Sequence, residues 1–241
     1  MSTMASRAEE NRVKAAYGRR NEYIPANFYS LLKLPNLLRV QELERKLTRV
    51  LTKSENQPVG NKKILEVGCG CGLWLIEFLR LGARPENLAG VDLLEERIAD
   101  AKELLPRAAT LKCGNSEQLD FADGSFDIVF QSMLFSSILN RKSRRQIASE
   151  MLRVLAPGGT ILWYDFFLSN PRNPDVRGLR KKDIAECFPN CRIQLCTTTL
   201  APPVAREVSR NSAILYWLLS AVPFLRSHYF GSITPRRSPG S

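Results

Sequence analysis

The stretch Ile-Leu-Glu-Val-Gly-Cys-Gly-Cys-Gly-Leu-Trp-Leu, residues 64–75, decides the fold that we expect for this chain. Its apolar run ends abruptly at three glycines spaced two residues apart, and an amphipathic segment over residues 73–81 follows at once. This order predicts a buried strand, a tight turn and a helix. Glycine lets a ligand approach the backbone closely, and a helix N-terminus presents free N–H groups. The stretch therefore indicates a site for a nucleotide-like ligand.

The spacing of the glycines narrows the class of ligand. Dinucleotide-binding proteins carry G-x-G-x-x-G, whereas this chain has E-x-G-x-G-x-G, with Trp74 and Leu75 where the late glycine would stand. An acid two residues before the first glycine suits a ligand with an ammonium group better than a pyrophosphate. In this motif the chain resembles the class I methyltransferases that depend on S-adenosylmethionine.

Further motifs follow in the order typical of that family. A second short strand, residues 87–93, ends at Asp92, where an acid hydrogen-bonds ribose hydroxyls in related nucleotide-binding folds. A third strand runs into Asn115, a fourth into Gln131, and Pro-Gly-Gly at 157–159 precedes a fifth strand over 160–166. The resemblance covers roughly residues 60–200. It implies an α/β, Rossmann-like, seven-stranded, mostly parallel sheet with helices on both faces and an antiparallel last strand. We place strands six and seven at 192–200 and 226–233.

The resemblance also implies a cofactor, S-adenosylmethionine, with S-adenosylhomocysteine as its product. Glu66 would favour the ammonium group, Asp92 would bind the ribose, and Gln131 would face the methionine part; structural support is the alternative role for Glu66 and Gln131. The adenine would lie beside Asn115 and the amide of its neighbour. The predicted cofactor-binding residues are Glu66, Gly68, Gly70, Gly72, Asp92, Leu93, Asn115, Ser116 and Gln131.

The composition limits the number of domains, the location of the protein and the kinds of partner that we expect. A chain of 241 residues with 44% hydrophobic and 24% charged residues suits one domain with a full core. No apolar run reaches the ~20 residues of a membrane span, and the first residues do not resemble a secretion signal, so we expect a cytoplasmic protein. The six cysteines lack zinc-site spacing, and we expect no metal. The net charge of +11 favours anionic partners, although a solvated basic surface explains it equally well.

The chain divides into an extension and a core. We expect residues 1–60 to form an N-terminal helical extension or cap, polar and mobile over 1–20 and helical over 37–51. Residues 61–241 would form the methyltransferase core, with an irregular loop over 169–178 and a disordered tail from 235. A helical insertion over 201–225 is strongly apolar. Core packing is the favoured explanation; a lid, a dimer surface and a site for an apolar substrate are the alternatives.

The catalytic candidates are Asp165, near the end of the fifth strand, and His228, the single histidine. Either would remove a proton from a hydroxyl acceptor, and we prefer Asp165. A structural role is the competing reading for each. One or two side chains of the N-terminal segment would contact the ligand, from the set Tyr17, Arg20, Tyr23 and Tyr29.

A narrower resemblance concerns the acceptor. Runs such as Leu-Trp-Tyr-Asp-Phe at 162–166 are similar to a bacterial, methyltransferase type 11-like subgroup associated with polysaccharide and cell-envelope biosynthesis. We therefore expect a small-molecule or glycan-linked acceptor, methylated at a hydroxyl, anionic or lipid-linked, with peripheral membrane contact and a monomeric or homodimeric enzyme. Strand four continues as Gln131-Ser132-Met133-Leu134 and lacks the Asn/Asp-Pro-Pro-Tyr turn of nucleic-acid methyltransferases, which argues against nucleic acid. The alternatives are a non-catalytic cofactor-binding subunit, an RNA or other nucleic-acid methyltransferase, and a nicotinamide-dependent oxidoreductase.

Overall fold

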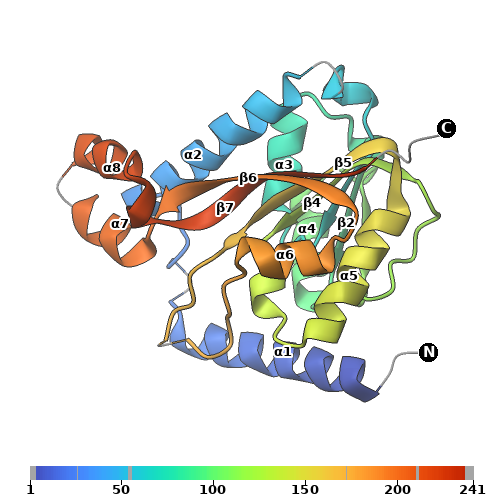
Figure 1. The fold of residues 1–241 in the computed structure, drawn as a ribbon, viewed down its shortest axis with the longest axis horizontal. Helices are drawn as coiled ribbons and strands as arrows, with labels where there is room; N and C mark the ends of the chain where they lie inside the picture. Colours follow the sequence, from blue (N-terminus) through green and yellow to red (C-terminus); the bar gives the residue numbers. More distant parts are fainter. Residues whose placement is uncertain (1–3, 26, 54–55, 172, 210–211, 237–241) are drawn as a thin grey trace.

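The structure is a computed structural model that describes residues 4–25, 27–53, 56–171, 173–209 and 212–236. Within these residues one seven-stranded sheet has the order β3-β2-β1-β4-β5-β7-β6 (Figure 1). Strand β7 is antiparallel to both of its neighbours, and the other adjacent strands pair in parallel. The strands are β1 (Ile64–Val67), β2 (Leu88–Asp92), β3 (Thr110–Cys113), β4 (Phe126–Ser132), β5 (Leu155–Phe166), β6 (Cys191–Leu200) and β7 (Arg226–Pro235). The predicted fold class is confirmed.

Helices cover both faces of this sheet, as an α/β fold with buried parallel strands requires. The α-helices are α1 (Met4–Tyr23), α2 (Leu34–Leu51), α3 (Leu73–Arg80), α4 (Glu95–Leu104), α5 (Arg141–Val154), α6 (Lys181–Cys187), α7 (Pro202–Val208) and α8 (Ala213–Ser220). Short 3-10 turns are η2 (Val59–Asn61), η3 (Pro85–Asn87), η4 (Phe135–Ser137) and η5 (Pro223–Leu225).

Two apolar cores lie on the two faces of the sheet. One packs α5 and α6 against side chains such as Val129 and Trp163. The other packs α2, α3 and α4 against side chains such as Phe130 and Tyr164. Because side chains alternate along a strand, neighbours on β4 and β5 point to opposite cores. A third, smaller cluster joins Leu38 of α2 to α7 and α8 at one end of the long axis (Figure 1).

The first helix corrects the expectation of a mobile start. Residues 4–23 form α1, although the sequence there has almost no apolar periodicity. One apolar side chain, Val13, is buried in the α5–α6 core. Ion pairs and hydrogen bonds add to this contact: the Glu9 carboxylate accepts from the Leu139 N–H at 2.6 Å, and Arg19 pairs with Asp175 at 2.9 Å. Periodicity could not reveal it, because its partners are polar loop residues far along the chain.

The apolar insertion forms helices α7 and α8, and only part of it is core. Tyr216 is fully buried with Leu38, Leu200 and Ala205. Ile214 and Leu218 of the same helix are 74% and 63% exposed. Among the residues described, no helix is both long enough and apolar enough to cross a membrane. The expected disorder from residue 235 falls mostly on 237–241, which lie outside the described residues.

Candidate functional site

The loop between β1 and α3 is built on three left-handed glycines. Gly68, Gly70 and Gly72 have φ of 76°, 54° and 80°. A Cβ on Gly72 would lie 2.6 Å from Leu105, and one on Gly68 would lie 3.1 Å from Leu134. At these two positions a larger residue is therefore disfavoured twice, by the close neighbouring side chain and by the positive φ. Only Gly70 leaves its surroundings open, so it is where a ligand can approach the loop.

Asp92, at the end of β2, ties this loop in place. One carboxylate oxygen accepts from the Gly70 N–H at 2.8 Å, and the other accepts from the Leu94 N–H at 3.0 Å. The side chain is 8% exposed. Each oxygen has lone pairs left after one hydrogen bond, so it can also accept from a ligand hydroxyl.

Glu66 lies inside β1 directly before the loop and is 1% exposed. Its Oε2 is buried and has no hydrogen-bond partner in the structure. Burial, followed by the negative charge of Asp92, raises the pKa of Glu66 well above its ordinary value. A buried polar atom without a partner is costly. A ligand ammonium group at this point would supply the missing partner, so the residues fit the predicted ligand.

The residues that we predict to bind the adenine follow β3 in the sequence, and Asn115 among them contacts helix α1. Asn115 donates to the Glu10 carboxylate at 3.2 Å and accepts from the Glu117 N–H at 2.9 Å. Ser116 is buried, and Leu93 is partly buried against the α5–α6 core. The structure therefore brings the predicted loop, ribose and adenine residues to the carboxyl ends of β1, β2 and β3.

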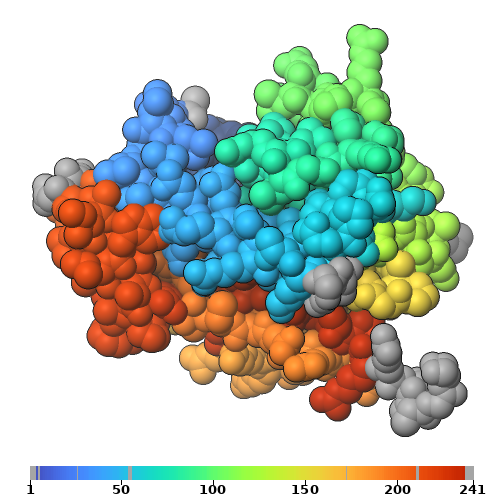
Figure 2. Space-filling model, turned by 90° about the horizontal axis from the view of Figure 1, so that it is seen from above, coloured from blue at the N-terminus to red at the C-terminus, as the bar shows by residue number. Residues whose placement is uncertain are grey.

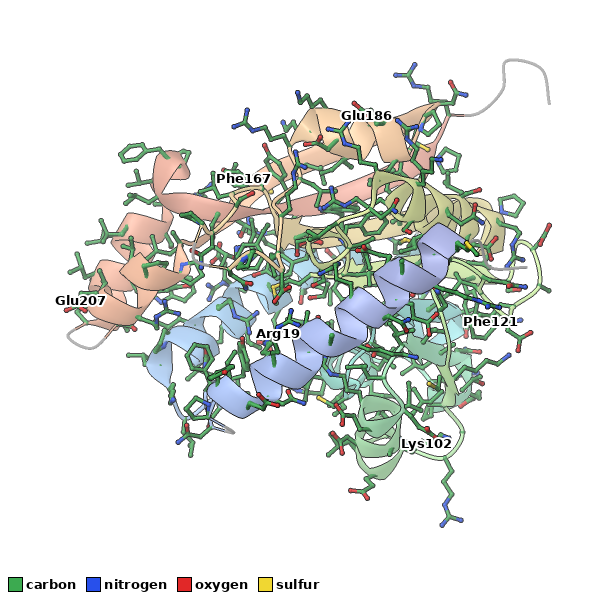
Figure 3. The ribbon with its side chains drawn as sticks, turned by 90° about the horizontal axis from the view of Figure 1, so that it is seen from below. Arg19, Lys102, Phe121, Phe167, Glu186 and Glu207 are labelled. Atoms are coloured by element: carbon green, nitrogen blue, oxygen red, sulfur yellow. The ribbon has the colours of Figure 1, made fainter. Side chains whose placement is uncertain are left out.

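Helix α1 crosses this edge of the sheet (Figure 3). It contacts the segments after β3, β4 and β5 through Glu10, Glu9 and Arg19. Near the C-terminus of α1, the Tyr17 ring centroid lies 4.3 Å from the Arg97 guanidinium. Arg20 lies near the rings of Tyr17 and Tyr29, whereas Tyr23 is 80% exposed. Among the N-terminal candidates, Tyr17 is thus the one held next to the glycine-loop edge.

Gln131 stabilises the turn that follows β4. It is fully buried, and its Oε1 accepts from the Leu134 N–H at 3.1 Å. Met133, in this turn, has φ of 57°, an uncommon conformation for a residue with a side chain. Because Leu134 contacts Gly68 and Met133 lines a separate pocket, residues 133–134 join the glycine loop to that pocket. This hydrogen bond gives the Gln131 side chain a structural role, and its contact with the methionine part of the cofactor stays a prediction.

The pocket encloses about 460 Å³ on the α2 face of the sheet. Its walls come from the segment before α2, from α2, from α7 and α8, and from the ends of β5, β6 and β7. The lining is mainly apolar, with basic side chains among it; it comprises Phe28, Lys33, Leu34, Pro35, Asn36, Arg39, Met133, Phe166, Thr199, Leu200, Pro202, Ala205, Arg206, Ser209, Tyr216 and His228.

His228 is the polar group in this pocket with the clearest chemistry. Its ring stacks on Tyr164, with centroids 4.9 Å apart. Ser227 Oγ lies 2.9 Å from Nδ1 and 3.5 Å from the Thr199 carbonyl oxygen, while Nε2 has no partner among the residues that the structure describes. If the hydroxyl donates to that carbonyl, it accepts from Nδ1–H, and Nε2 carries the free lone pair. Burial, then the charge of Arg39, lowers the pKa of His228 well below its ordinary value, so the ring is neutral in the folded protein.

Asp165 lies elsewhere, on the α5–α6 face of the sheet. Its oxygens accept from the Ser136 N–H at 3.0 Å and from the Phe166 N–H at 2.8 Å. Burial raises its pKa to about 6. Asp165 does not line the pocket, and its neighbour Phe166 does. The geometry therefore favours His228 over Asp165 as a base in this pocket and gives Asp165 the role of holding the turn after β4.

The sequence reasoning missed a polar cluster beside His228. Glu42 of α2 is buried; its Oε1 accepts from Thr198 Oγ1 and, at 3.0 Å, from the Thr199 N–H, and its Oε2 has no partner. Thr199 has φ of 61°, which is a strained value for a β-branched residue. The Tyr216 hydroxyl is also buried without a partner. One signal was available: Glu42 follows Leu38 by four residues, so an acid stands on the apolar face of α2.

Comparisons with known proteins bear on the family and on the fold. Residues 64–159 match the family model described as a methyltransferase domain. A sterol 24-C-methyltransferase of Yarrowia lipolytica is 32% identical over 131 residues, 50% of this chain and 34% of the relative. A ubiquinone/menaquinone biosynthesis C-methyltransferase of Geobacter sulfurreducens is 33% identical over 116 residues, 46% of this chain and 43% of the relative. The chain thus spans less than half the length of these two relatives.

Among solved structures, the plantazolicin methyltransferase BpumL in complex with SAH superposes with a TM-score of 0.62. It is 16% identical in sequence, and the match covers 95% of this chain and 96% of BpumL. At that identity the likeness shows the fold alone. The matched segment 64–159 contains the glycine loop, Asp92, Asn115 and Gln131, but not His228.

Proposed function

We propose that this chain, which belongs to the class I S-adenosylmethionine-dependent methyltransferases, transfers a methyl group to a hydroxyl of an acceptor bound in the α2-face pocket. The observation that carries the proposal is the unpartnered Nε2 of a neutral, buried His228 in the pocket lining. The pocket adjoins the glycine loop through residues 133–134.

S-adenosylmethionine, when bound, supplies a methyl group that the positive charge of its sulfur already activates. Gly70 would admit it to the loop, Asp92 would accept from its ribose hydroxyls, and Glu66 would pair with its ammonium group. The main task left to the protein is to align acceptor and donor, which can contribute several kcal/mol. His228 would then take the proton from the acceptor hydroxyl, with Ser227 and the Thr199 carbonyl holding the ring in the required tautomer.

The walls of the pocket favour an acceptor with an apolar body. Phe28, Leu34, Met133, Phe166 and Leu200 would be poor partners for a bare, fully hydroxylated sugar. A lipid-linked glycan or a hydroxylated lipid would suit both the apolar walls and the base. The two curated relatives are named as C-methyltransferases of sterol and quinone biosynthesis. Methylation of an acidic carbon on such a molecule is therefore the second candidate, and it also needs a base.

The test begins with calorimetric binding of S-adenosylmethionine. Labelled cofactor is then incubated with nucleotide sugars, lipid-linked glycans, sterols and quinols, and the position of the label separates oxygen from carbon methylation. No binding of the cofactor, or no transfer to any class that contains an apolar body, contradicts the proposal.

The role of His228 is tested on whichever acceptor is found. His228→Gln should lower the single-turnover rate by about 10²–10⁴-fold and leave cofactor affinity unchanged. Asp165→Asn is the matched control, because it alters a buried side chain outside the pocket, and its rate should stay within a few-fold of the wild-type rate. A His228→Gln enzyme that keeps more than about a third of the wild-type rate would mean that no side-chain base acts here.

A further inference from the structure

One end of the molecule carries an apolar surface that its own core does not use. Residues 213–225 contain no charged residue. Ile214, Leu218 and Phe224 in this stretch are 74%, 63% and 84% exposed. Ile214 and Leu218 are one turn apart on α8, so they share a face, and Tyr216 on another face is buried. Contiguous exposed apolar side chains on a folded protein mark an interaction surface.

A second exposed apolar segment lies at the same pocket. Leu32, before α2, is 98% exposed, and Leu34 is 36% exposed. Leu34 lines the pocket from one wall, and Tyr216 of α8 lines it from another. We call Leu32, Leu34, Ile214, Leu218 and Phe224 the apolar rim. Both segments of the rim therefore belong to the structure that encloses the acceptor pocket.

Basic side chains flank the apolar rim. Residues 28–53 carry six Lys and Arg and two Glu, and one of those acids, Glu42, is buried. The Arg45 guanidinium lies 4.0 Å from the ring centroid of Trp217, which places basic helix α2 against α8. Figure 2 shows α2, in blue, beside the orange-red α7 and α8. Lys33 and Arg206 stand at the pocket itself.

We infer that the apolar rim docks on an anionic lipid bilayer, with the acceptor pocket taking its substrate from that surface. Apolar side chains entering the headgroup boundary and cations pairing with anionic headgroups are the two contributions that drive interfacial binding. A second copy of this chain fits less well. A two-fold interface would place the basic flank of α2 near its own copy, where like charges repel. Uptake of the substrate from the bilayer rests on the proposed function, whereas the docking itself does not.

The experiment measures co-sedimentation of the full chain with vesicles of phosphatidylcholine alone and of phosphatidylcholine with phosphatidylglycerol. Wild-type protein should bind the anionic vesicles more strongly, and added salt should weaken the binding. The triple variant Ile214→Ser, Leu218→Ser, Phe224→Ser should lose at least about tenfold in apparent affinity, because three apolar side chains no longer enter the bilayer.

Leu104→Ser is the matched control, since Leu104 of α4 is 54% exposed and lies outside the rim. It should bind vesicles as the wild type does. Calorimetry with S-adenosylmethionine on every variant reports folding and the cofactor site separately from docking, so a failed docking and a failed function give different results.

Three outcomes would overturn the inference. The first is a wild type that does not bind anionic vesicles, or that binds neutral ones equally well. The second is a triple variant that binds as tightly as Leu104→Ser. The third is a dimer in light scattering that the triple variant dissociates, which would assign the rim to a second copy of the chain.

Discussion

The two halves of the sheet present their candidate sites by different means. In the half formed by β1, β2 and β3, the site is made mainly of backbone conformation, with Asp92 bonded through both oxygens and Oε2 of Glu66 as the buried atom left without a partner among the described residues. In the half formed by β5, β6 and β7, the pocket keeps unpartnered polar atoms on Glu42, Tyr216 and His228. The first half is preorganised by a short local motif. The second is assembled from segments far apart in the sequence and retains unused capacity for hydrogen bonding.

The largest expected effect comes from separating β6 from β7. Gly231 pairs with Trp163 of β5 and Leu195 of β6. A Cβ at this position would overlap the carbonyl oxygen of Gln194. Gly231→Ala should therefore lower the free energy of unfolding by more than about 3 kcal/mol, because the clash is with backbone that cannot rotate away. Urea denaturation measures it.

Gly114→Ala is the control for that substitution, because nothing lies within 4 Å of the position that its Cβ would take. It should change stability by less than about 0.5 kcal/mol. Equal effects of the two substitutions would mean that the pairing of β6 with β7 does not depend on a glycine.

The next effect concerns the cofactor half. Asp92→Ala should weaken binding of S-adenosylmethionine by about 1–3 kcal/mol, since the ribose loses a charged acceptor and the Gly70 N–H loses its anchor. Calorimetry measures the affinity. Asp100→Ala, an exposed acid on α4, should leave it unchanged. If Asp92→Ala also retains full affinity, the ribose lies elsewhere.

The contrast between the halves also explains what the sequence could predict. Strand ends, glycine spacing and the acid after β2 are local signals, and they led to the fold, to Asp92 and to the glycine loop. The preference for Asp165 over His228 rested on its position near the end of β5 and on the direction in which its side chain alternates there. That direction could not be related to a pocket whose walls come from α2, α7 and α8, because these helices follow from distant parts of the sequence. Helix α1 was missed for a related reason, because polar contacts such as Arg19 with Asp175 leave no apolar pattern.

A smaller effect distinguishes a neutral His228 from a charged one without any acceptor. Burial lowers the pKa of the folded-state ring, whereas the unfolded chain regains a value near 6.5. As pH falls below about 6.5, the unfolded state binds a proton that the folded state does not. Stability should therefore fall toward acid pH, by at most about 1.4 kcal/mol per pH unit from this group.

Denaturation of wild type and His228→Gln between pH 5 and 7.5 isolates that contribution. Asp165, whose pKa is raised to about 6, affects both proteins equally and cancels in the difference. The stability difference should change with pH below about 6.5 and be constant above it. Parallel profiles over the whole range would show that the ring titrates in the same way in the folded and the unfolded protein.

The smallest expected effect tests whether the hydroxyl of Tyr216, which lines the pocket, lacks a hydrogen-bond partner. The Tyr216 hydroxyl is buried and unpartnered, so Tyr216→Phe should leave the stability of the free protein unchanged or raise it by up to about 1 kcal/mol. Tyr164→Phe is the matched substitution, because that hydroxyl lies 3.1 Å from Thr199 Oγ1; it should cost about 1 kcal/mol. Both are fully buried tyrosines on the same side of the sheet, and the Tyr164 hydroxyl, unlike that of Tyr216, has side-chain hydrogen-bond partners in Thr199 and Arg39. If Tyr216→Phe destabilises the protein as much as Tyr164→Phe does, its hydroxyl already has a partner, and the acceptor has one fewer group to bind. If only Tyr164→Phe is costly, the Tyr216 hydroxyl is free to bind the acceptor, and its removal should appear as a raised KM.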